Sequence, residues 1–176
     1  MQILIAGFGG QGVLFAGKFL AYAGMILSKQ VSWLPSYGPE MRGGTANCSV
    51  VISDEPVGSP IVSTPDVLIA MNLPSFEKYQ SSVVKGGMII YDSTLISASE
   101  DRPDVVYYPL PATKTAQENG LEGLANMILA GSFVKHAFSE AYPVIDDAIS
   151  KVVPPKKAHL AEPNRRAVQI GYEGRA

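Results

Sequence analysis

The stretch that decides the fold is Met1-Gln-Ile-Leu-Ile-Ala6, followed by Gly7-Phe-Gly-Gly-Gln-Gly12 and by a segment from Val13 to about Leu27. The first part is a continuous apolar run, which is typical of a strand covered on both faces. The second part has four glycines in six residues, so its backbone can turn sharply and let a ligand approach. In the third part, apolar residues and glycines recur at helical spacing, and Lys18 is the only charge. Together the three parts predict half of a β–α–β unit.

The glycine-rich turn has three possible roles. Its spacing, Gly7-x-Gly9-x-x-Gly12, matches the dinucleotide-binding fingerprint, but the next predicted strand, Gln30–Leu34, has no acidic residue to hold a ribose. The turn could instead be purely structural, or it could hold a phosphate-bearing ligand at the start of the helix. We take Gly7, Gly9, Gly10, Gln11 and Gly12 as candidate binding residues.

Composition limits the classes of function. The chain has 176 residues, which we interpret as one domain over 1–176, and a net charge of −2 without any basic block, so nucleic-acid binding is not expected. The apolar runs are too short to span a membrane, and no signal peptide pattern is present, which predicts a cytoplasmic location. Only 17% of residues are charged, so we expect apolar surface to be covered by another subunit. Cys48 stands alone, so no metal site is expected.

A second candidate binding segment runs from Leu34 to Gly44. Its two prolines and three glycines favour a shaped loop, yet it also carries large polar and aromatic side chains. A plain alternative is that Glu40 and Arg42 form a solvated ion pair. The candidate binding residues in this loop are Ser36, Tyr37, Gly38, Glu40, Arg42, Gly43 and Gly44.

The remaining pattern predicts an α/β fold. Residues 45–53 alternate between apolar and polar, which indicates a strand with Cys48 on its buried face, and the turn at 54–58 suggests an antiparallel pair at one edge of a mostly parallel sheet. Asn72 and Asp92 follow buried strands, so they should lie near the glycine turn, where Asn72 caps a helix or binds a ligand. We expect the helix after Asn72 to end at Gly86 and Gly87. The second half reads as helices, one of which we expect to begin with a capping box from Thr115 to Glu118.

The sequence contains no recognisable catalytic set. It has no Gly-x-Ser-x-Gly elbow, no Walker lysine and no cysteine matched to a histidine. The chain therefore looks like a subunit that shapes a ligand site and has no catalytic residues of its own.

Taken together, the motifs resemble the gamma subunit of 2-oxoacid:ferredoxin oxidoreductases. The resemblance rests on Gly7–Gly12 and on Pro35–Asn47, with support from Ala70–Asn72, from Tyr91–Ser93 and from motifs near 162–164 and 171–173. The sequence of the Pro35–Asn47 loop is most similar to that of the 2-oxoglutarate and branched-chain members. The family resemblance implies a three-layer α/β/α domain like the gamma domain of pyruvate:ferredoxin oxidoreductase.

The resemblance also implies an assembly. Alpha, beta and delta-type partner subunits would carry thiamine diphosphate, Mg²⁺ and iron–sulfur clusters, and this chain would hold none of these by itself. The complex would convert a 2-oxo acid, 2-oxoglutarate in the first instance, to acyl-coenzyme A and CO₂ while reducing ferredoxin. The gamma subunit would lie on the coenzyme A side. Two alternatives remain, the small subunit of indolepyruvate:ferredoxin oxidoreductase and a stand-alone module for a nucleotide-like ligand.

Overall fold

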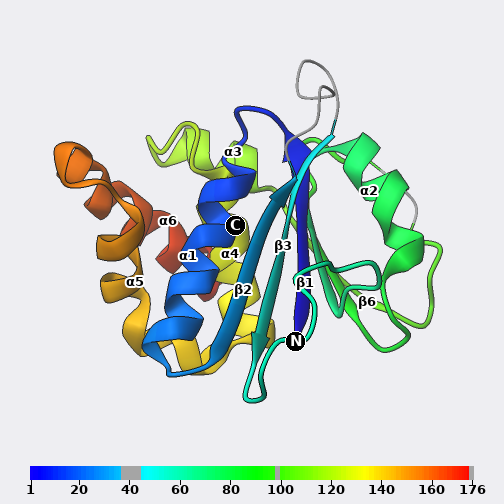
Figure 1. The fold of residues 1–176 in the computed structure, drawn as a ribbon. Helices are drawn as coiled ribbons and strands as arrows, with labels where there is room; N and C mark the ends of the chain where they lie inside the picture. The colour runs from blue at the N-terminus through cyan, green and yellow to red at the C-terminus, as the bar shows by residue number, and fades with distance from the viewer. Residues whose placement is uncertain (37–44, 98–99, 175–176) are drawn as a thin grey trace.

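A six-stranded mixed sheet lies at the centre of the protein, between two layers of helices (Figure 1). The structure is a computed structural model that describes residues 1–36, 45–97 and 100–174. The strands are β1 (Gln2–Phe8), β2 (Gln30–Ser36), β3 (Thr45–Ser53), β4 (Val67–Ala70), β5 (Met88–Asp92) and β6 (Val106–Leu110), and the helices are α1 (Val13–Ile26), α2 (Leu73–Tyr79), α3 (Ala112–Glu118), α4 (Ala125–Ala137), α5 (Ile145–Val152) and α6 (Ala161–Glu173). The predicted three-layer α/β/α fold is confirmed.

The order of strands in the sheet is β2-β3-β1-β4-β5-β6. Strands β1, β4, β5 and β6 run parallel to one another, whereas β3 is antiparallel to both β1 and β2. The antiparallel pair expected at one edge is therefore present, although β3 pairs with the earlier strands β1 and β2 and not with the chain after the turn at 54–58. Strand β3 also separates β2 from β1, so the strand after α1 is not the neighbour of the first strand, as it would be in a dinucleotide-binding fold.

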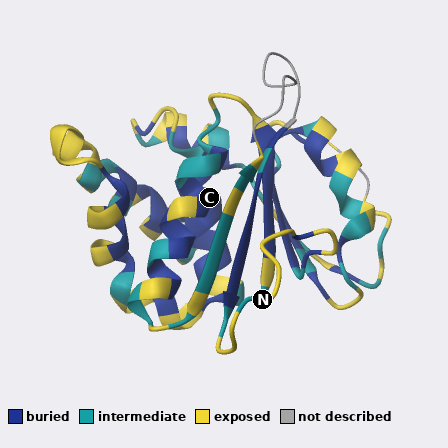
Figure 2. Ribbon diagram, viewed as in Figure 1, coloured by how far each residue is buried: buried dark blue, intermediate teal, exposed yellow. Residues whose placement is uncertain are grey.

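The two faces of the sheet are covered very unequally. Helices α1, α3, α4, α5 and α6 lie over one face, and α2 covers the other (Figure 1). Alternate residues of each strand enter different cores, so Ile3 and Ile5 contact the large helical core while Leu4 contacts the smaller one. The central strands are buried along their length (Figure 2).

In the large core, two helices cross at glycines. A Cβ atom added to Gly171 of α6 would collide with the carbonyl oxygen of Ile128, and one added to Gly131 of α4 would collide with that of Val168. The backbones of α4 and α6 are thus in direct contact, an approach that only glycine allows. This crossing fixes α4, whose first turn contributes to the site described below.

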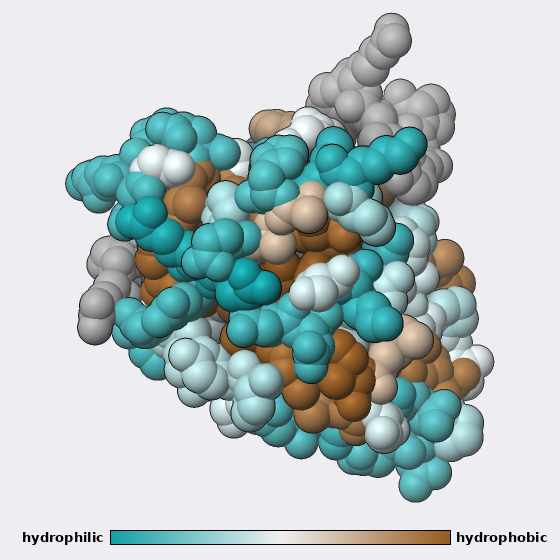
Figure 3. Space-filling model, turned by 90° about the vertical axis from the view of Figure 1, so that its left-hand side faces the viewer, coloured by the Kyte–Doolittle hydropathy of each residue, from teal (hydrophilic) through white to brown (hydrophobic). Residues whose placement is uncertain are grey.

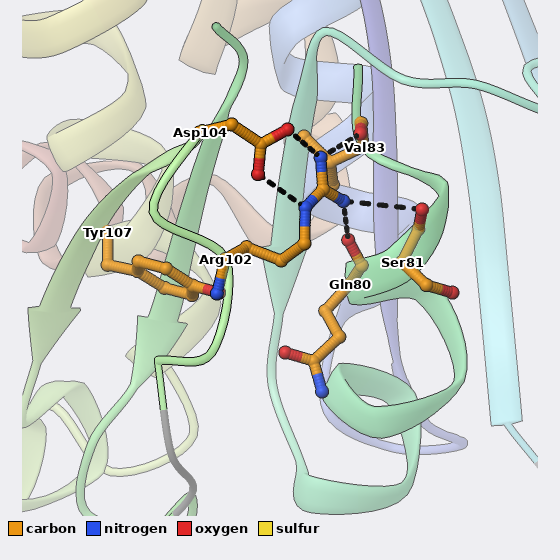
Figure 4. Close-up of polar contacts among 6 residues, drawn as sticks. All are labelled: Gln80, Ser81, Val83, Arg102, Asp104 and Tyr107. Carbon is orange, nitrogen blue, oxygen red and sulfur yellow. Dashed lines mark hydrogen bonds and ion pairs between the residues drawn. The ribbon is translucent and has the colours of Figure 1, made fainter. Parts of the chain in front are cut away.

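The smaller layer is fastened by an arginine. Arg102 donates hydrogen bonds to the carbonyl oxygens of Gln80, Ser81 and Val83, at 3.2–3.3 Å, just after the end of α2 (Figure 4). Its guanidinium also pairs with the Asp104 carboxylate at 2.6 Å through two nitrogens. That hydrogen bond lowers the pKa of Asp104 and raises that of Arg102. Arg102 therefore ties the connector before β6 to the α2 layer.

Three local predictions need correction. Pro35 and Ser36, expected in a loop, belong to β2, which is an edge strand, and edge strands tolerate proline. The helix after Asn72 ends at Tyr79, before the glycines expected to stop it, and a short 3₁₀ turn follows. The capping box at Thr115 is also wrong, because Thr115 lies in the middle of α3.

Candidate functional site

The glycine turn Phe8–Gly12 lies at the carboxyl end of β1, the edge where ligands bind in open α/β sheets. Gly10 and Gly12 have φ angles of +94° and +74°, a region that side-chain-bearing residues rarely adopt. Gly12 is constrained a second time, since an added Cβ would collide with the side chain of Asn126. The turn therefore requires glycine for both conformation and space.

Gln11 holds the turn in place. Its Oε1 accepts hydrogen bonds from the Phe8 amide at 2.6 Å and from Asn72 Nδ2 at 3.1 Å, and its Nε2 donates to the Met71 carbonyl at 3.0 Å. Asn72 is only 3% exposed, and its Oδ1 accepts from the Ser75 amide at 2.9 Å, so the predicted helix cap is confirmed. Both side chains thus make internal contacts that link β1 to the start of α2.

Asn126 contacts the turn from the other side. It is the second residue of α4 and 3% exposed, and its Nδ2 donates to the Gly12 carbonyl at 3.0 Å. Its Oδ1 is buried and accepts no hydrogen bond from any described residue. Since a buried acceptor without a donor costs free energy, this atom is suited to an N–H group of a ligand.

A cavity of about 290 Å³ opens between the glycine turn, α3 and α4. Its lining residues include Gln11, Asp92, Leu95, Gln117, Glu122 and Asn126. Asp92 is 1% exposed and accepts hydrogen bonds from the amide and hydroxyl of Thr113, at 3.1 Å and 2.5 Å. The Asp92 carboxylate, at the end of β5, therefore caps the first turn of α3 in place of the predicted capping box at Thr115.

A second hollow, of about 320 Å³, lies on the opposite side of the turn. Gly9, Gly12, Phe15 and Ser36 line it, together with the first residues of α1. No described side chain caps α1, so its first-turn N–H groups are left to solvent or to a ligand. The turn therefore separates a hollow at a helix N-terminus from a cavity that contains two carboxylates.

The predicted site residues divide into two groups. Of the described residues, Gly7 and Asn72 lie against the turn, and Gly9–Gly12 and Ser36 line the two hollows. Tyr37, Gly38, Glu40, Arg42, Gly43 and Gly44 lie outside the described residues. The strands that flank this loop end beside the site, because Thr45 pairs with Phe8.

The sequence alone did not point to Asn126. The only signal was a single polar side chain in the apolar run Leu124–Leu129, directly after a turn with Gly120 and Gly123 at positive φ.

Cys48, in contrast, was predicted correctly as a buried side chain. It is 0% exposed, and burial raises the pKa of its thiol to about 12, which removes it as a nucleophile at neutral pH.

The described part of the chain contains no group of three or more His, Cys, Asp or Glu side chains arranged to hold a metal ion. None of its helices combines the length and apolar character that crossing a membrane requires.

The fold and the position of the cavity define an α/β domain with a ligand-binding edge built on a glycine turn. The chain matches the family model described as pyruvate ferredoxin/flavodoxin oxidoreductase over residues 2–174. It therefore belongs to this family, and the resemblance read from the sequence is confirmed.

Two similar curated relatives differ in how much of their own length this chain covers. The chain is 48% identical over 131 residues to ketoisovalerate oxidoreductase subunit VorA of Methanothermobacter thermautotrophicus, covering 74% of this chain but 27% of the relative. It thus spans about a quarter of that relative's length. It is 34% identical to 2-oxoglutarate synthase subunit KorC of Methanocaldococcus jannaschii, covering 98% of this chain and 92% of the relative.

Two solved structures share the fold. One is the gamma subunit of a keto/oxoacid ferredoxin oxidoreductase from Geobacter sulfurreducens, with 30% identity, a TM-score of 0.82 and coverage of 98% of this chain and 96% of that one. The other is 2-oxoglutarate:ferredoxin oxidoreductase from Magnetococcus marinus with 2-oxoglutarate, coenzyme A and succinyl-CoA bound. It has 25% identity, a TM-score of 0.87 and coverage of 99% of this chain and 30% of that one.

Proposed function

We propose that this chain is the gamma subunit of a multi-subunit 2-oxoacid:ferredoxin oxidoreductase of the 2-oxoglutarate type. The assembly would oxidatively decarboxylate the 2-oxo acid, transfer the acyl group to coenzyme A and reduce ferredoxin. The observation that carries the proposal is the kinship to KorC, which extends over 98% of this chain and 92% of the relative.

In this proposal the redox chemistry belongs to other chains. Alpha, beta and delta-type subunits would hold thiamine diphosphate, Mg²⁺ and the iron–sulfur clusters, and ferredoxin would dock on the assembly. The gamma subunit would contribute the edge around the glycine turn to the coenzyme A side of the active site. The isolated chain would be folded and catalytically silent.

The two hollows suit different parts of coenzyme A. The cavity beside Asn126 includes Asp92 and Glu122 and no described cation, so it disfavours a phosphate and suits a neutral arm with amide N–H groups. The hollow at the start of α1 has the polarity that phosphate prefers. At about 290 Å³, the Asn126 cavity is at the small end of ligand pockets, roughly 300–1,000 Å³, so it would hold only part of so large a molecule.

The assay that tests the function uses the native assembly. The chain should copurify with larger subunits that carry iron–sulfur clusters, and the complex should reduce ferredoxin fastest with 2-oxoglutarate among a panel of 2-oxo acids, in a coenzyme A-dependent manner. Turnover by the purified chain alone, or a chain that joins no larger assembly, contradicts the proposal. The latter result would favour a stand-alone binding module.

A second candidate substrate has its own support. The 48% identity to the ketoisovalerate subunits exceeds the 34% identity to KorC, although it covers a shorter stretch. Preference for branched-chain 2-oxo acids in the same panel would select this type. Preference for indolepyruvate would select the third type, whose subunit IorB of Archaeoglobus fulgidus is 22% identical.

The role of the 37–44 loop remains a proposal drawn from its sequence. Arg42 would bind a phosphate of coenzyme A, since its planar guanidinium can donate two parallel hydrogen bonds. Loss of a charge-assisted bond costs about 1.5–3 kcal/mol, so Arg42→Ala should raise the KM for coenzyme A roughly ten- to a hundred-fold. The KM for the 2-oxo acid should stay constant. Arg165→Ala, which removes surface ion pairs, is the matched control.

An intact, size-verified mutant complex is needed for that comparison. An unchanged KM for coenzyme A would contradict the role of Arg42. Dissociation of the complex without a selective kinetic change would instead indicate that Arg42 pairs with a partner subunit.

A further inference from the structure

The outer surface of α1 is unusually apolar for a helix that faces solvent. Leu14, Lys18, Tyr22 and Met25 follow one another at helical spacing along this surface, and Met25 is 58% exposed. Lys18 is the only charged residue of the helix. Aromatic and methionine side chains with few charges are typical of the centre of a protein–protein interface.

A groove of about 380 Å³ continues this surface, between α1, β2 and the connection from α5 to α6. Its apolar walls include Phe15, Trp33 and Leu160, and Leu160 is 37% exposed. Lys18 and Lys157 stand among these walls. The side of the molecule formed by α1, α5 and α6 shows apolar surface between polar side chains (Figure 3). We call Leu14, Phe15, Lys18, Trp33, Lys157 and Leu160 the α1 groove.

The charged side chains that line the groove, Lys18 and Lys157, are both cations. Residues 148–161 contain Lys151, Lys156 and Lys157 and no aspartate or glutamate, although the whole chain has a net charge of −2. Among the ion pairs formed between described residues, none involves Lys18 or Lys157. The groove therefore combines apolar walls with two cations that have no carboxylate partner within the described chain.

We propose that the α1 groove receives an extended segment of another protein chain, which places an apolar side chain against Phe15 and Leu160 and carboxylates beside Lys18 and Lys157. The inference rests on the proposed function, since this chain is taken to be a partner subunit of the oxidoreductase. A second copy of the protein is a poor occupant. In a two-fold symmetric dimer whose axis passes through the groove, the same basic groove would face itself, and like charges would repel.

Zero-length cross-linking of the native assembly with a carbodiimide tests the contact directly, because it joins an amine only to a carboxylate in contact with it. Lys18 and Lys157 should be linked to aspartate or glutamate residues of another subunit. The Lys29–Asp54 pair, with 2.8 Å between Nζ and Oδ1, is the internal positive control. Lys85, which is exposed after the α2 layer, should give no link to a partner.

Recovery of the Lys29–Asp54 link without any link from Lys18 or Lys157 to another subunit overturns the proposal. Links from these lysines to a second copy of this chain overturn it as well.

Charge reversal supplies an independent measurement. The double variant Lys18→Glu/Lys157→Glu should bind the remaining subunits about tenfold more weakly, because like charges now meet across the contact. Added salt should narrow this difference from the wild type, because it screens the repulsion in the variant and the attraction in the wild type. Lys85→Glu is the matched control. The variant Lys18→Arg/Lys157→Arg keeps both positive charges and should bind like the wild type. Circular dichroism verifies that each variant is folded.

The outcomes separate the two claims. If the reversed variant assembles and turns over like the wild type, the groove is not a docking site, and the proposed function stands. If the wild-type chain joins no assembly at all, the proposed function fails and takes this inference with it.

Discussion

Glycine serves two different purposes in two regions of this molecule. At the α4–α6 crossing, Gly131 and Gly171 are needed because two helix backbones touch, and any Cβ atom would strike a carbonyl oxygen. In the turn after β1, Gly10 and Gly12 are needed because the chain adopts positive φ angles and because Asn126 occupies the adjacent space. The first region holds the fold together, and the second leaves backbone and polar groups available to a ligand.

The difference shows how stability and function can be separated here. At the crossing the two helix backbones touch and both glycines are buried, whereas the turn is held by the side-chain amides of Gln11, Asn72 and Asn126. A substitution at the crossing should therefore act on the free energy of unfolding. A substitution at the turn should act mainly on ligand binding.

The largest effect is expected from Gly171→Ala. Because the new methyl group would overlap the Ile128 carbonyl oxygen, α6 must shift away from α4, at a cost of about 3 kcal/mol or more. For a chain of this size the melting temperature should fall by roughly 6–12 °C in calorimetry. Gly58→Ala is the control, since its Cβ would meet nothing within 4 Å. Equal melting temperatures for the two variants would show that the crossing is looser than described.

A smaller and more selective effect is expected from Asn126→Ala, with Asn164→Ala as its match. Both asparagines are buried, at 3% and 2% exposure, and both donate Nδ2 to a backbone carbonyl, that of Gly12 or of Leu160. Each substitution should destabilise the chain by about 1–2 kcal/mol. Only Asn126→Ala should also raise the KM of the assembly for coenzyme A, by roughly three- to ten-fold.

Steady-state kinetics on size-verified complexes makes this comparison. A similar change in the KM for coenzyme A in both variants would mean that Asn126 acts through stability alone.

The smallest effect is expected at the Arg102–Asp104 pair. The hydrogen bond from Arg102 lowers the pKa of Asp104 in the folded chain, so the pair stabilises the fold above the unfolded pKa of about 3.9. This contribution is lost as the pH falls through the lower, folded pKa. Asp104→Asn should lower the melting temperature by at most about 2 °C at pH 7, and the difference should shrink below about pH 4. A difference that grows in acid would contradict the assignment.

Much of the fold was predictable because its signals are local. The strand, turn and helix of residues 2–26 follow from hydrophobic periodicity and glycine spacing, and the alternation in 45–53 correctly placed Cys48 in the core. The cap of α3 was not predictable, because Asp92 reaches it from β5, 21 positions away. Distance along the chain hides such a contact.

The candidate site was predictable only in part for the same reason. The spacing of the glycines predicts the glycine turn. Asn126, however, contacts Gly12 across 114 positions and looks in sequence like an ordinary helix residue. Likewise, nothing local reveals that β3 inserts between β1 and β2. That insertion removes the strand neighbour on which a dinucleotide site depends.

Hydrogen–deuterium exchange of the native assembly, with and without saturating coenzyme A, tests most directly whether the glycine-turn edge faces the acyl acceptor. Coenzyme A should slow exchange in peptides that cover Gly7–Phe15 and Gly123–Leu129, while peptides from α5 stay unchanged. If coenzyme A is bound, as shown by turnover of the same sample, and neither segment is protected, the edge around the glycine turn is not the coenzyme A side of the active site.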